Sequence, residues 1–295
     1  MKIGIDIGGS HIAVALIKNS KEIIKKIEKD LTDEDKNNIE KSIENIIIKS
    51  IDKILKEENL QKNDIEKIGI AAPGEPVDGK ITKAWNLNIK EFDITSILKK
   101  YYSTKIILKN DAKSAGLCEK QYGSIKEYDD AIFLCIGTGI GGAVFQNGKM
   151  LKPKNCSGFE VGHMIIKKDG EKCNCGQRGC FERYASMRVF KEKITKKLDL
   201  PNSLSGYEIL TKIKENKELV EDVINEYIED LSIGLMNLIN IFSPEAITFG
   251  GSFAFFKEIL LDRLKETLKQ SINEKLPEIK VAEYINDAGI IGTIL

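Results

Sequence analysis

Three glycine-rich turns, each directly after a run of β-forming residues, constrain the fold of this 295-residue chain more than any other feature. They occupy residues 6–10 (DIGGS), 137–142 (GTGIGG) and 250–252 (GGS). The run before the first turn alternates apolar and polar positions, which is the period of a β-strand. Ligands of α/β sheets bind beyond the carboxyl ends of the strands, so we expect the three turns to line a ligand site.

The chain repeats an architecture, because strand, glycine turn and strand are followed by helices near residue 1 and again near residue 131. This repetition predicts an α/β fold of two domains that face each other across a cleft. We expect one domain at residues 1–110, with a C-terminal helix near residues 286–295 as a candidate to complete it, and the other at residues 111–285. Strands are expected at residues 67–74, 105–111, 131–145 and 245–252, and helices at residues 39–57, 183–199, 219–241 and 253–273.

The composition limits the partners and the location that we expect. The 45 lysine and arginine residues balance 45 aspartate and glutamate residues, so the formal net charge is zero. A neutral chain has no global attraction for nucleic acid or for an anionic membrane, and we expect neither as a partner. No apolar run reaches the roughly 18 residues of a membrane-spanning helix. Because the N-terminus also lacks the apolar core of a signal peptide, we expect a cytoplasmic protein.

The first two turns offer backbone N–H groups to a phosphate. Gly8 and Gly9 would let an anion approach the backbone closely, and Asp6 could hold Mg²⁺ directly or through water. A tight hairpin with a capping aspartate is the alternative. Residues 137–142 contain the G-x-G-x-x-G pattern of dinucleotide-binding proteins, but that pattern requires a helix after the glycines. The Asn-Gly pair that follows marks a hairpin turn instead, which leaves a hairpin tip suited to phosphate.

Three of the six cysteines, Cys173, Cys175 and Cys180, fall within eight residues, where disulfide partners, metal ligands and free thiols are the alternatives. Most thiols of cytoplasmic proteins stay reduced, and a disulfide between Cys173 and Cys175 would be strained. The same spacing suits one metal ion, and the glycines at 176 and 179 free the backbone to wrap around it. The neutral charge and the lack of a basic stripe oppose a zinc module that binds nucleic acid.

Taken together, the motifs resemble the ROK family, named for repressors, uncharacterised frames and kinases, within the sugar-kinase/actin/heat-shock ATPase superfamily. The stretches that carry the resemblance are GIDIGGS, GIAAPG, KND, GTGIGGA, EVGHM, CNCGQRGCFERYAS and PEAITFGGS. Its most specific part is the combination of EVGH with CxCGxxGCxE. The resemblance implies a two-domain actin-like ATPase (ribonuclease H-like) fold with an interdomain cleft. It also implies a structural zinc ion held by His163, Cys173, Cys175 and Cys180, a closed N/S ligand set of the kind that structural zinc prefers.

The resemblance further implies a sugar site. The residues that would hydrogen-bond the sugar hydroxyls are Gly74, Asn110, Asp111, Glu160, His163 and Glu182. A histidine that ligates zinc through one nitrogen can present the other to a sugar oxygen. Without the family, Glu182 could be a charge at a helix N-terminus and Asn110 a strand-end cap. Asp111 would be the general base, accepting the proton of the sugar 6-hydroxyl while that oxygen attacks the γ-phosphorus of ATP.

The expected reaction phosphorylates a hexose or an N-acetylhexosamine with ATP and Mg²⁺, and it leaves glucose, N-acetylmannosamine and N-acetylglucosamine open as substrates. The residues expected at the nucleotide are Asp6, Gly8, Gly9, Ser10, His11, Gly137, Thr138, Gly139, Gly141, Gly142, Gly250, Gly251 and Ser252. The last three would border the adenosine, and the amides of the other glycine turns would take the phosphate charge. Family members commonly form dimers or tetramers, so we expect a homodimer or homotetramer.

Three departures from the family pattern bear on the site. Ser10-His11 stands where a Thr-Lys pair is common, and histidine lacks a fixed positive charge at neutral pH, which leaves more of that role to Mg²⁺. Phe159 occupies a position that is usually glycine, directly before the expected sugar-binding glutamate. Pro153 replaces another glycine in the loop before it. Phe159 and Pro153 lie beside the expected sugar site, so the identity of the sugar stays open.

Two other functions compete for the same residues. Sugar-sensing regulators of the family carry a helix-turn-helix domain before the first strand, whereas the first strand is expected here from residue 2, and Asp111 is present. An ATPase that uses nucleotide only as a conformational switch would leave the cysteine cluster and the sugar-binding residues without a role. We therefore expect a sugar kinase.

Overall fold

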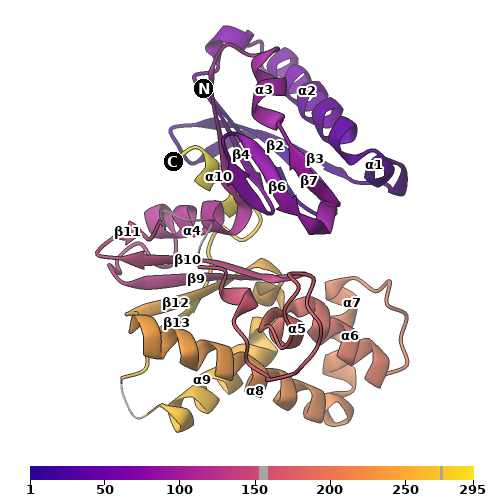
Figure 1. Cartoon of the computed structure of the whole chain (residues 1–295), viewed down its shortest axis with the longest axis vertical. Coiled ribbons are helices and arrows are strands. Elements are labelled where there is room, and N and C mark those ends of the chain that lie inside the picture. Colours follow the sequence, from indigo (N-terminus) through magenta and orange to yellow (C-terminus); the bar gives the residue numbers. More distant parts are fainter. Residues whose placement is uncertain (153–158, 273–274) are drawn as a thin grey trace. The chain divides into compact units, whose positions relative to one another are not determined.

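The computed structural model describes residues 1–152, 159–272 and 275–295 (Figure 1). It is a mixed α/β structure, in which the described residues form two five-stranded sheets and one three-stranded sheet. This confirms the predicted fold class. Within the described ranges, none of the helices combines the length and the apolar character that crossing a membrane requires. Pro153, one of the departures noted above, lies outside the described residues.

Two compact units divide the described chain. The first combines Met1–Cys118 with Asn286–Leu295, and the second combines Glu119–Lys152 with the described residues from 159 to 285. The division falls inside helix α4 (Asp111–Tyr122). The first unit therefore contains the two ends of the described chain.

A five-stranded sheet of order β3-β2-β1-β4-β8 forms the centre of the first unit. Its strands are β1 (Lys2–Ile7), β2 (His11–Lys18), β3 (Glu22–Asp30), β4 (Lys67–Ala72) and β8 (Lys105–Asn110). Strand β1 pairs antiparallel with β2 and parallel with β4, and β4 pairs parallel with β8. The carboxyl ends of β1, β4 and β8 therefore share one edge of this sheet.

Smaller elements complete the first unit. A three-stranded antiparallel sheet has the order β5-β6-β7, and short helices connect or cover the sheets. The strands are β5 (Glu75–Val77), β6 (Lys80–Ala84) and β7 (Ile89–Phe92); the α-helices are α1 (Asp33–Asn37), α2 (Ile39–Glu57), α3 (Ile94–Lys99) and α10 (Ala288–Thr293); the 3-10 helices are η1 (Lys62–Asp64) and η2 (Trp85–Leu87).

The central strands of the first five-stranded sheet are mostly buried on both faces, to which successive side chains point in turn. On one face, α2 covers β1, β2 and β3, and its apolar residues recur about every turn, as expected for an amphipathic helix. On the other face lies α10. The β2 residues of the α2 face are Ile12, Val14 and Leu16, whereas Ala13, Ala15 and Ile17 form a cluster with Ile290 and Ile294 beside α10.

Helix α10 lies close to the sheet because glycines underlie it. A Cβ atom on Gly69 would lie 2.5 Å from Thr293 Oγ1, and one on Gly4 would lie 2.7 Å from Ile290. Lys67 Nζ donates a hydrogen bond to the carbonyl oxygen of Ile294 at 2.8 Å, at the C-terminal end of the helix. A cation at this end satisfies carbonyl groups that no helical N–H reaches.

The second unit repeats the first sheet with the order β11-β10-β9-β12-β13. Strand β9 pairs antiparallel with β10 and parallel with β12, and β12 pairs parallel with β13. The strands are β9 (Ala131–Ile136), β10 (Ile140–Gln146), β11 (Lys149–Met150), β12 (Ala246–Gly250) and β13 (Glu278–Val281). The helices are α5 (Glu182–Ala185), α6 (Met187–Lys197), α7 (Gly206–Glu215), α8 (Lys217–Phe242) and α9 (Lys257–Ser271), with the 3-10 helices η3 (Val161–His163) and η4 (Gly251–Phe256). An apolar core joins the sheet to these helices.

Most long elements agree with the sequence-based predictions. The helix predicted over residues 39–57 is α2, and the helix predicted over 219–241 lies within α8. The segment 183–199 is interrupted, because Ser186 leaves the helical conformation and caps α6. The sequence reasoning missed β3 and the three-stranded sheet.

Candidate active site

The carboxyl ends of β4 and β8 bring three predicted sugar-binding residues together in the first unit. Gly74 follows β4 with φ +81°, a conformation that glycine adopts without strain. Asn110 ends β8 and donates from Nδ2 to the Gly74 carbonyl oxygen at 3.2 Å. Its Oδ1 accepts from the Lys113 backbone N–H at 3.1 Å, so Asn110 also caps α4. Asp111 is the first residue of that helix, where the helix dipole favours a carboxylate.

Asp6 and Asp111 interact electrostatically at this edge of the sheet. Burial raises the pKa of Asp6 to about 7, and the carboxylates of Asp111 and Glu28 add to the shift, while Lys26 opposes it. Burial also raises the pKa of Asp111, against the opposing effect of a hydrogen bond from the backbone N–H of Ala112 at 2.7 Å. A cation would relieve the repulsion between Asp6 and Asp111, so this edge suits a divalent metal ion.

The first glycine turn joins β1 to β2 and begins two residues after Asp6. The Gly8 N–H donates to the His11 carbonyl oxygen at 2.9 Å, which closes the turn. Gly9 and Ser10 are exposed at its tip. The His11 ring lies between the Ser10 hydroxyl, 3.3 Å from Nδ1, and a Glu28 carboxylate oxygen, 3.8 Å from Nε2. Of the residues predicted at the nucleotide, Gly8, Gly9 and Ser10 therefore form one short hairpin loop, and His11 begins β2.

The second unit contains the four predicted zinc ligands as one cluster. One ligand atom from each of His163, Cys173, Cys175 and Cys180 lies within 4.8 Å of the others. The Sγ atoms of Cys175 and Cys180 are 3.6 Å apart, and Cys173 Sγ is 3.7 Å from His163 Nδ1. A tetrahedral zinc site with ordinary bond lengths has S–S edges of about 3.8 Å and S–N edges of about 3.6 Å. The donor set and its spacing therefore fit zinc, with Nδ1 as the histidine ligand.

The backbone around the cluster explains how ligands so close in sequence reach one point. Gly176 and Gly179 have φ +94° and φ +80°, values that L side chains rarely adopt. An isolated bridge pairs Ile165 with Cys180, which brings the segment after His163 beside the last cysteine. Burial raises the pKa of the Cys173 and Cys180 thiols. Metal binding must displace their protons, so metal affinity at this cluster depends on pH.

Two glutamates of the predicted sugar site flank the cluster. Glu160 directly precedes η3, which contains His163, and Glu182 begins α5. Glu182 Oε1 lies 3.3 Å from Cys173 Sγ and 3.9 Å from His163 Nδ1. Phe159, before Glu160, has φ +52°, so this position is one where glycine would be free of strain. Its ring packs edge-on against Phe242 with the centroids 6.0 Å apart.

The second glycine turn is shorter than the sequence suggests. Residues 137–139 make the turn, while Gly141 and Gly142 lie inside β10, opposite Cys135 and Leu134. A Cβ atom on Gly139 would lie 2.7 Å from Glu182 Oε2, so the turn and the cluster are neighbours within this unit. The third turn follows β12: Gly250 ends the strand and Gly251, with φ +68°, begins η4.

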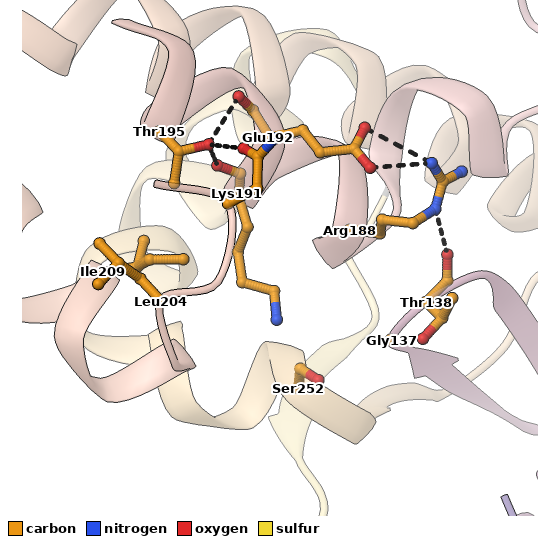
Figure 2. A pocket seen from close by; sticks show the side chains of 10 residues that line it. Gly137, Thr138, Arg188, Lys191, Glu192, Thr195, Leu204, Ile209 and Ser252 are labelled. Atoms are coloured by element: carbon orange, nitrogen blue, oxygen red, sulfur yellow. Dashed lines mark hydrogen bonds and ion pairs between the residues drawn. The ribbon is translucent and has the colours of Figure 1, made fainter. Parts of the chain in front are cut away.

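A cavity of about 300 Å³ joins the second and third turns (Figure 2). Three of its lining residues, Gly137, Thr138 and Ser252, are predicted at the nucleotide. The others come from α6, α7 and the segment between them, and they are Arg188, Lys191, Glu192, Thr195, Asn202, Leu204 and Ile209. The Lys191 side chain extends toward Ser252. This volume lies at the small end of the range for ligand pockets.

Comparison with known proteins settles the family, because the ROK family model matches residues 2–295. The chain belongs to the ROK family. The resemblance that the motifs predicted is thereby confirmed, and it extends over both units.

Named ROK relatives include enzymes and repressors. The chain is 27% identical to a glucokinase of Thermotoga maritima, over 98% of this chain and 95% of the relative. It is 29% identical to a xylose repressor of Caldicellulosiruptor bescii, over 91% of this chain and 70% of the repressor. A ROK family glucokinase from Streptomyces griseus, solved with glucose and AMPPNP, has a TM-score of 0.83 at 22% identity, over 99% of this chain and 97% of that chain. At that identity the likeness shows the fold alone.

The sequence reasoning missed the α6 residues of this ROK protein that line the cavity. Arg188 and Lys191 read as ordinary surface cations of a helix, since nothing in their local pattern refers to the glycine turn 50 residues earlier. Their spacing of three, which places two side chains on one face of a helix, was the available signal. The predicted roles of the individual site residues stay predictions.

Proposed function

We propose that this protein is an ATP-dependent kinase that phosphorylates a hexose or N-acetylhexosamine at the 6-hydroxyl. The observation that carries the proposal is the half-buried carboxylate of Asp111 at the start of α4, next to Asn110 and Gly74. The glucokinase relative, matched over nearly its full length, supports the reaction class. The glycine turns, whose backbone N–H groups suit phosphate oxygens, support ATP as the phosphate donor.

Asp111 would act as the general base. The sugar 6-hydroxyl gives its proton to the Asp111 carboxylate while its oxygen forms a bond to the γ-phosphorus. The bond between that phosphorus and the β–γ bridging oxygen breaks, and ADP leaves. Such a transfer depends mainly on positioning and on neutralising charge. The raised pKa of Asp111 strengthens it as a base relative to an exposed aspartate.

The nucleotide would be held by backbone amides of the glycine turns. The N–H groups of Gly9 in the first unit, and of Thr138 and Gly139 in the second, would bind phosphate oxygens. The N–H groups of Gly8 and Gly137 instead close their turns by donating to the carbonyl oxygens of His11 and Gly139. Asp6 is the residue that would hold Mg²⁺, which supplies positive charge to the phosphates. Ser252 borders the cavity that would take the adenosine.

The zinc ion would have a structural role in this proposal. His163, Cys173, Cys175 and Cys180 would hold it, and His163 Nε2 is then the nitrogen that remains for a sugar oxygen. Glu160 and Glu182, adjacent in sequence to the ligands, would accept hydrogen bonds from sugar hydroxyls. The homodimer or homotetramer and the cytoplasmic location stay predictions.

The test is ADP release by the purified protein with Mg²⁺ and ATP across a panel of hexoses and N-acetylhexosamines. We expect turnover with at least one sugar, and a loss of about 10²- to 10⁴-fold in Asp111→Asn. Sugar binding measured by calorimetry should persist in that variant. Asp33→Asn, which changes a fully exposed aspartate of the same unit, is the control. Unchanged turnover in Asp111→Asn would reject the assigned base.

A sugar-binding regulator without kinase activity is the second candidate, because a xylose repressor is among the relatives. The same panel separates the two functions. A regulator would bind a sugar and release no ADP with any member of the panel, and Asp111→Asn would change nothing but sugar affinity.

A further inference from the structure

Arg188 makes two hydrogen bonds to the second glycine turn, although it is not among the residues predicted at the nucleotide. Its backbone N–H donates to the Gly137 carbonyl oxygen at 3.2 Å, and its Nε donates to the Thr138 carbonyl oxygen at 3.3 Å. A third bond within the turn runs from the Gly137 N–H to the Gly139 carbonyl oxygen at 2.9 Å. Three successive carbonyl oxygens of the turn are thus engaged, two of them by Arg188. Figure 2 shows the bond from the Arg188 side chain to Thr138.

These contacts fix the direction of the turn's N–H groups. The peptide bonds here are trans, and in a planar trans peptide the C=O and N–H groups point in opposite directions. Because the Gly137 and Thr138 carbonyls point at Arg188, the N–H groups of Thr138 and Gly139 point away from it. Rotation of either peptide would bring a carbonyl oxygen toward a bound phosphate, where two negative charges repel.

Arg188 lies in the first turn of α6. It is the second residue of the helix, after the cap Ser186. The first N–H groups of a helix lack partners within it, and here the Gly137 carbonyl serves one of them. A cation in the first turn is unfavourable for the helix dipole. Glu192, one turn later, offsets this by accepting from Arg188 Nη1 at 3.1 Å, and it holds the guanidinium in place.

A purely stabilising role accounts poorly for this arrangement. The Arg188–Glu192 pair is exposed, with 36% and 54% of the two side chains accessible, and exposed ion pairs contribute little to stability. The hydrogen bond from Nε is different, since it acts on a peptide group of the predicted phosphate turn. Loss of this hydrogen bond should change the orientation of the peptide group between Thr138 and Gly139 more than it changes the stability of the fold.

We propose that Arg188 is a positioning residue of the donor site, which holds the carbonyl groups of Gly137 and Thr138 so that the following N–H groups face the phosphates of the nucleotide. This inference rests on the proposed function. Arg188 also lines the cavity proposed for the adenosine, and the inference assigns its guanidinium group, bonded to Thr138, to the phosphate end of the nucleotide.

The test compares Arg188→Met with the wild-type protein. This variant keeps the side-chain stem and the backbone bond to Gly137 but removes the bond to Thr138. We expect the KM for ATP and the inhibition constant of ADP to rise about tenfold, the effect of one hydrogen bond to a charged group. The inhibition constant of adenosine, which has no phosphate, and the KM for the sugar should stay within twofold. Arg188→Lys, which restores a donor without the planar fork, should give an intermediate KM for ATP.

Lys193→Met is the matched control, since Lys193 lies on the same helix and pairs with Glu226 at 3.0 Å. It should leave both inhibition constants unchanged. An unchanged KM for ATP in Arg188→Met, or equal weakening of adenosine and ADP, would overturn the inference. If the wild-type protein phosphorylates no sugar, the proposed function fails, and displacement of a fluorescent ADP analogue by ADP and adenosine then decides the role of Arg188. A wild-type protein that binds no nucleotide would refute both.

Discussion

The two units use the same sheet for different purposes. Both sheets have three antiparallel strands followed by two parallel ones, and the register that pairs Lys2 with Lys67 in one pairs Ala131 with Ala246 in the other. By that register, Asp6 in the first sheet corresponds to Cys135 in the second. The first turn thus follows an aspartate, while the second follows a cysteine and accepts hydrogen bonds from an arginine. In the proposed function, both turns would offer backbone amides to phosphate, and the side chains would decide which turn also binds a cation.

The two sheets also differ in the structure that lies beside them. The first is approached closely by α10, because its positions facing that helix include Gly4 and Gly69. The corresponding residues of the second sheet are Phe133 and Thr248, which have side chains. The second unit adds the His/Cys cluster beside its turn, which has no counterpart among the described residues of the first. The first unit therefore has a helix packed closely on its sheet, whereas the second has a ligand set through which a bound zinc ion would stabilise it.

The largest expected effect concerns this metal ligand set. Cys180→Ala should lose the bound zinc and destabilise the second unit by several kcal/mol, since the free energy of binding structural zinc adds to folding. Metal content by mass spectrometry and thermal unfolding measure the two changes. Cys118→Ala removes an equally buried thiol of the first unit and should cost about 1 kcal/mol with the zinc retained. Similar losses in the two variants would contradict the comparison.

A smaller expected effect is a pH dependence of stability that arises at the first turn, beside Asp6, and not at the second. The pKa of Asp6, about 7, exceeds its ordinary value of 3.8, so between these values the native state binds more protons than the unfolded state. Stability in magnesium-free buffer should therefore fall as pH rises from 3.8 to about 7, by as much as about 4 kcal/mol from this group. Asp6→Asn should reduce this slope and leave the part that the raised pKa of Asp111 contributes, and Cys135→Ala should leave the slope unchanged. Denaturant midpoints across this pH range provide the measurement, and an unaltered slope in Asp6→Asn would show that another group causes it.

The smallest effect compares the supports of the two sheets at equivalent positions. Gly69→Ala places a methyl group against Thr293 and should lower stability by about 1–3 kcal/mol. Thr248→Val removes only a hydroxyl that lies 2.8 Å from Ser124 Oγ, and it should cost about 1 kcal/mol or less. Chemical denaturation of the two variants gives the ranking. A Thr248→Val protein that loses more than Gly69→Ala would disprove the idea that close helix contact is specific to the first sheet.

Local patterns revealed much of the fold and less of the site. Period-two alternation and glycine turns predicted β1, β2, β9 and β10, because those signals are short-range. Strand β3 was missed, since Glu22–Asp30 lies at the sheet edge with mostly polar residues. The cysteine spacing and the family resemblance together predicted the cluster that the structure forms. The contact of Arg188 with Thr138 could not be read from the sequence, because it depends on how α6 meets a hairpin far away in the chain.

The grouping of residues 286–295 with the first unit has a consequence for synthesis on the ribosome. Domains generally fold from the N-terminus as the chain emerges, but here the helix that covers one face of the first sheet is translated after the whole second unit. Until then, the small apolar residues Ala13 and Ala15, which cluster with α10 in the structure, would lack that cover. Maturation of the earliest-made sheet is therefore delayed until translation reaches its last helix.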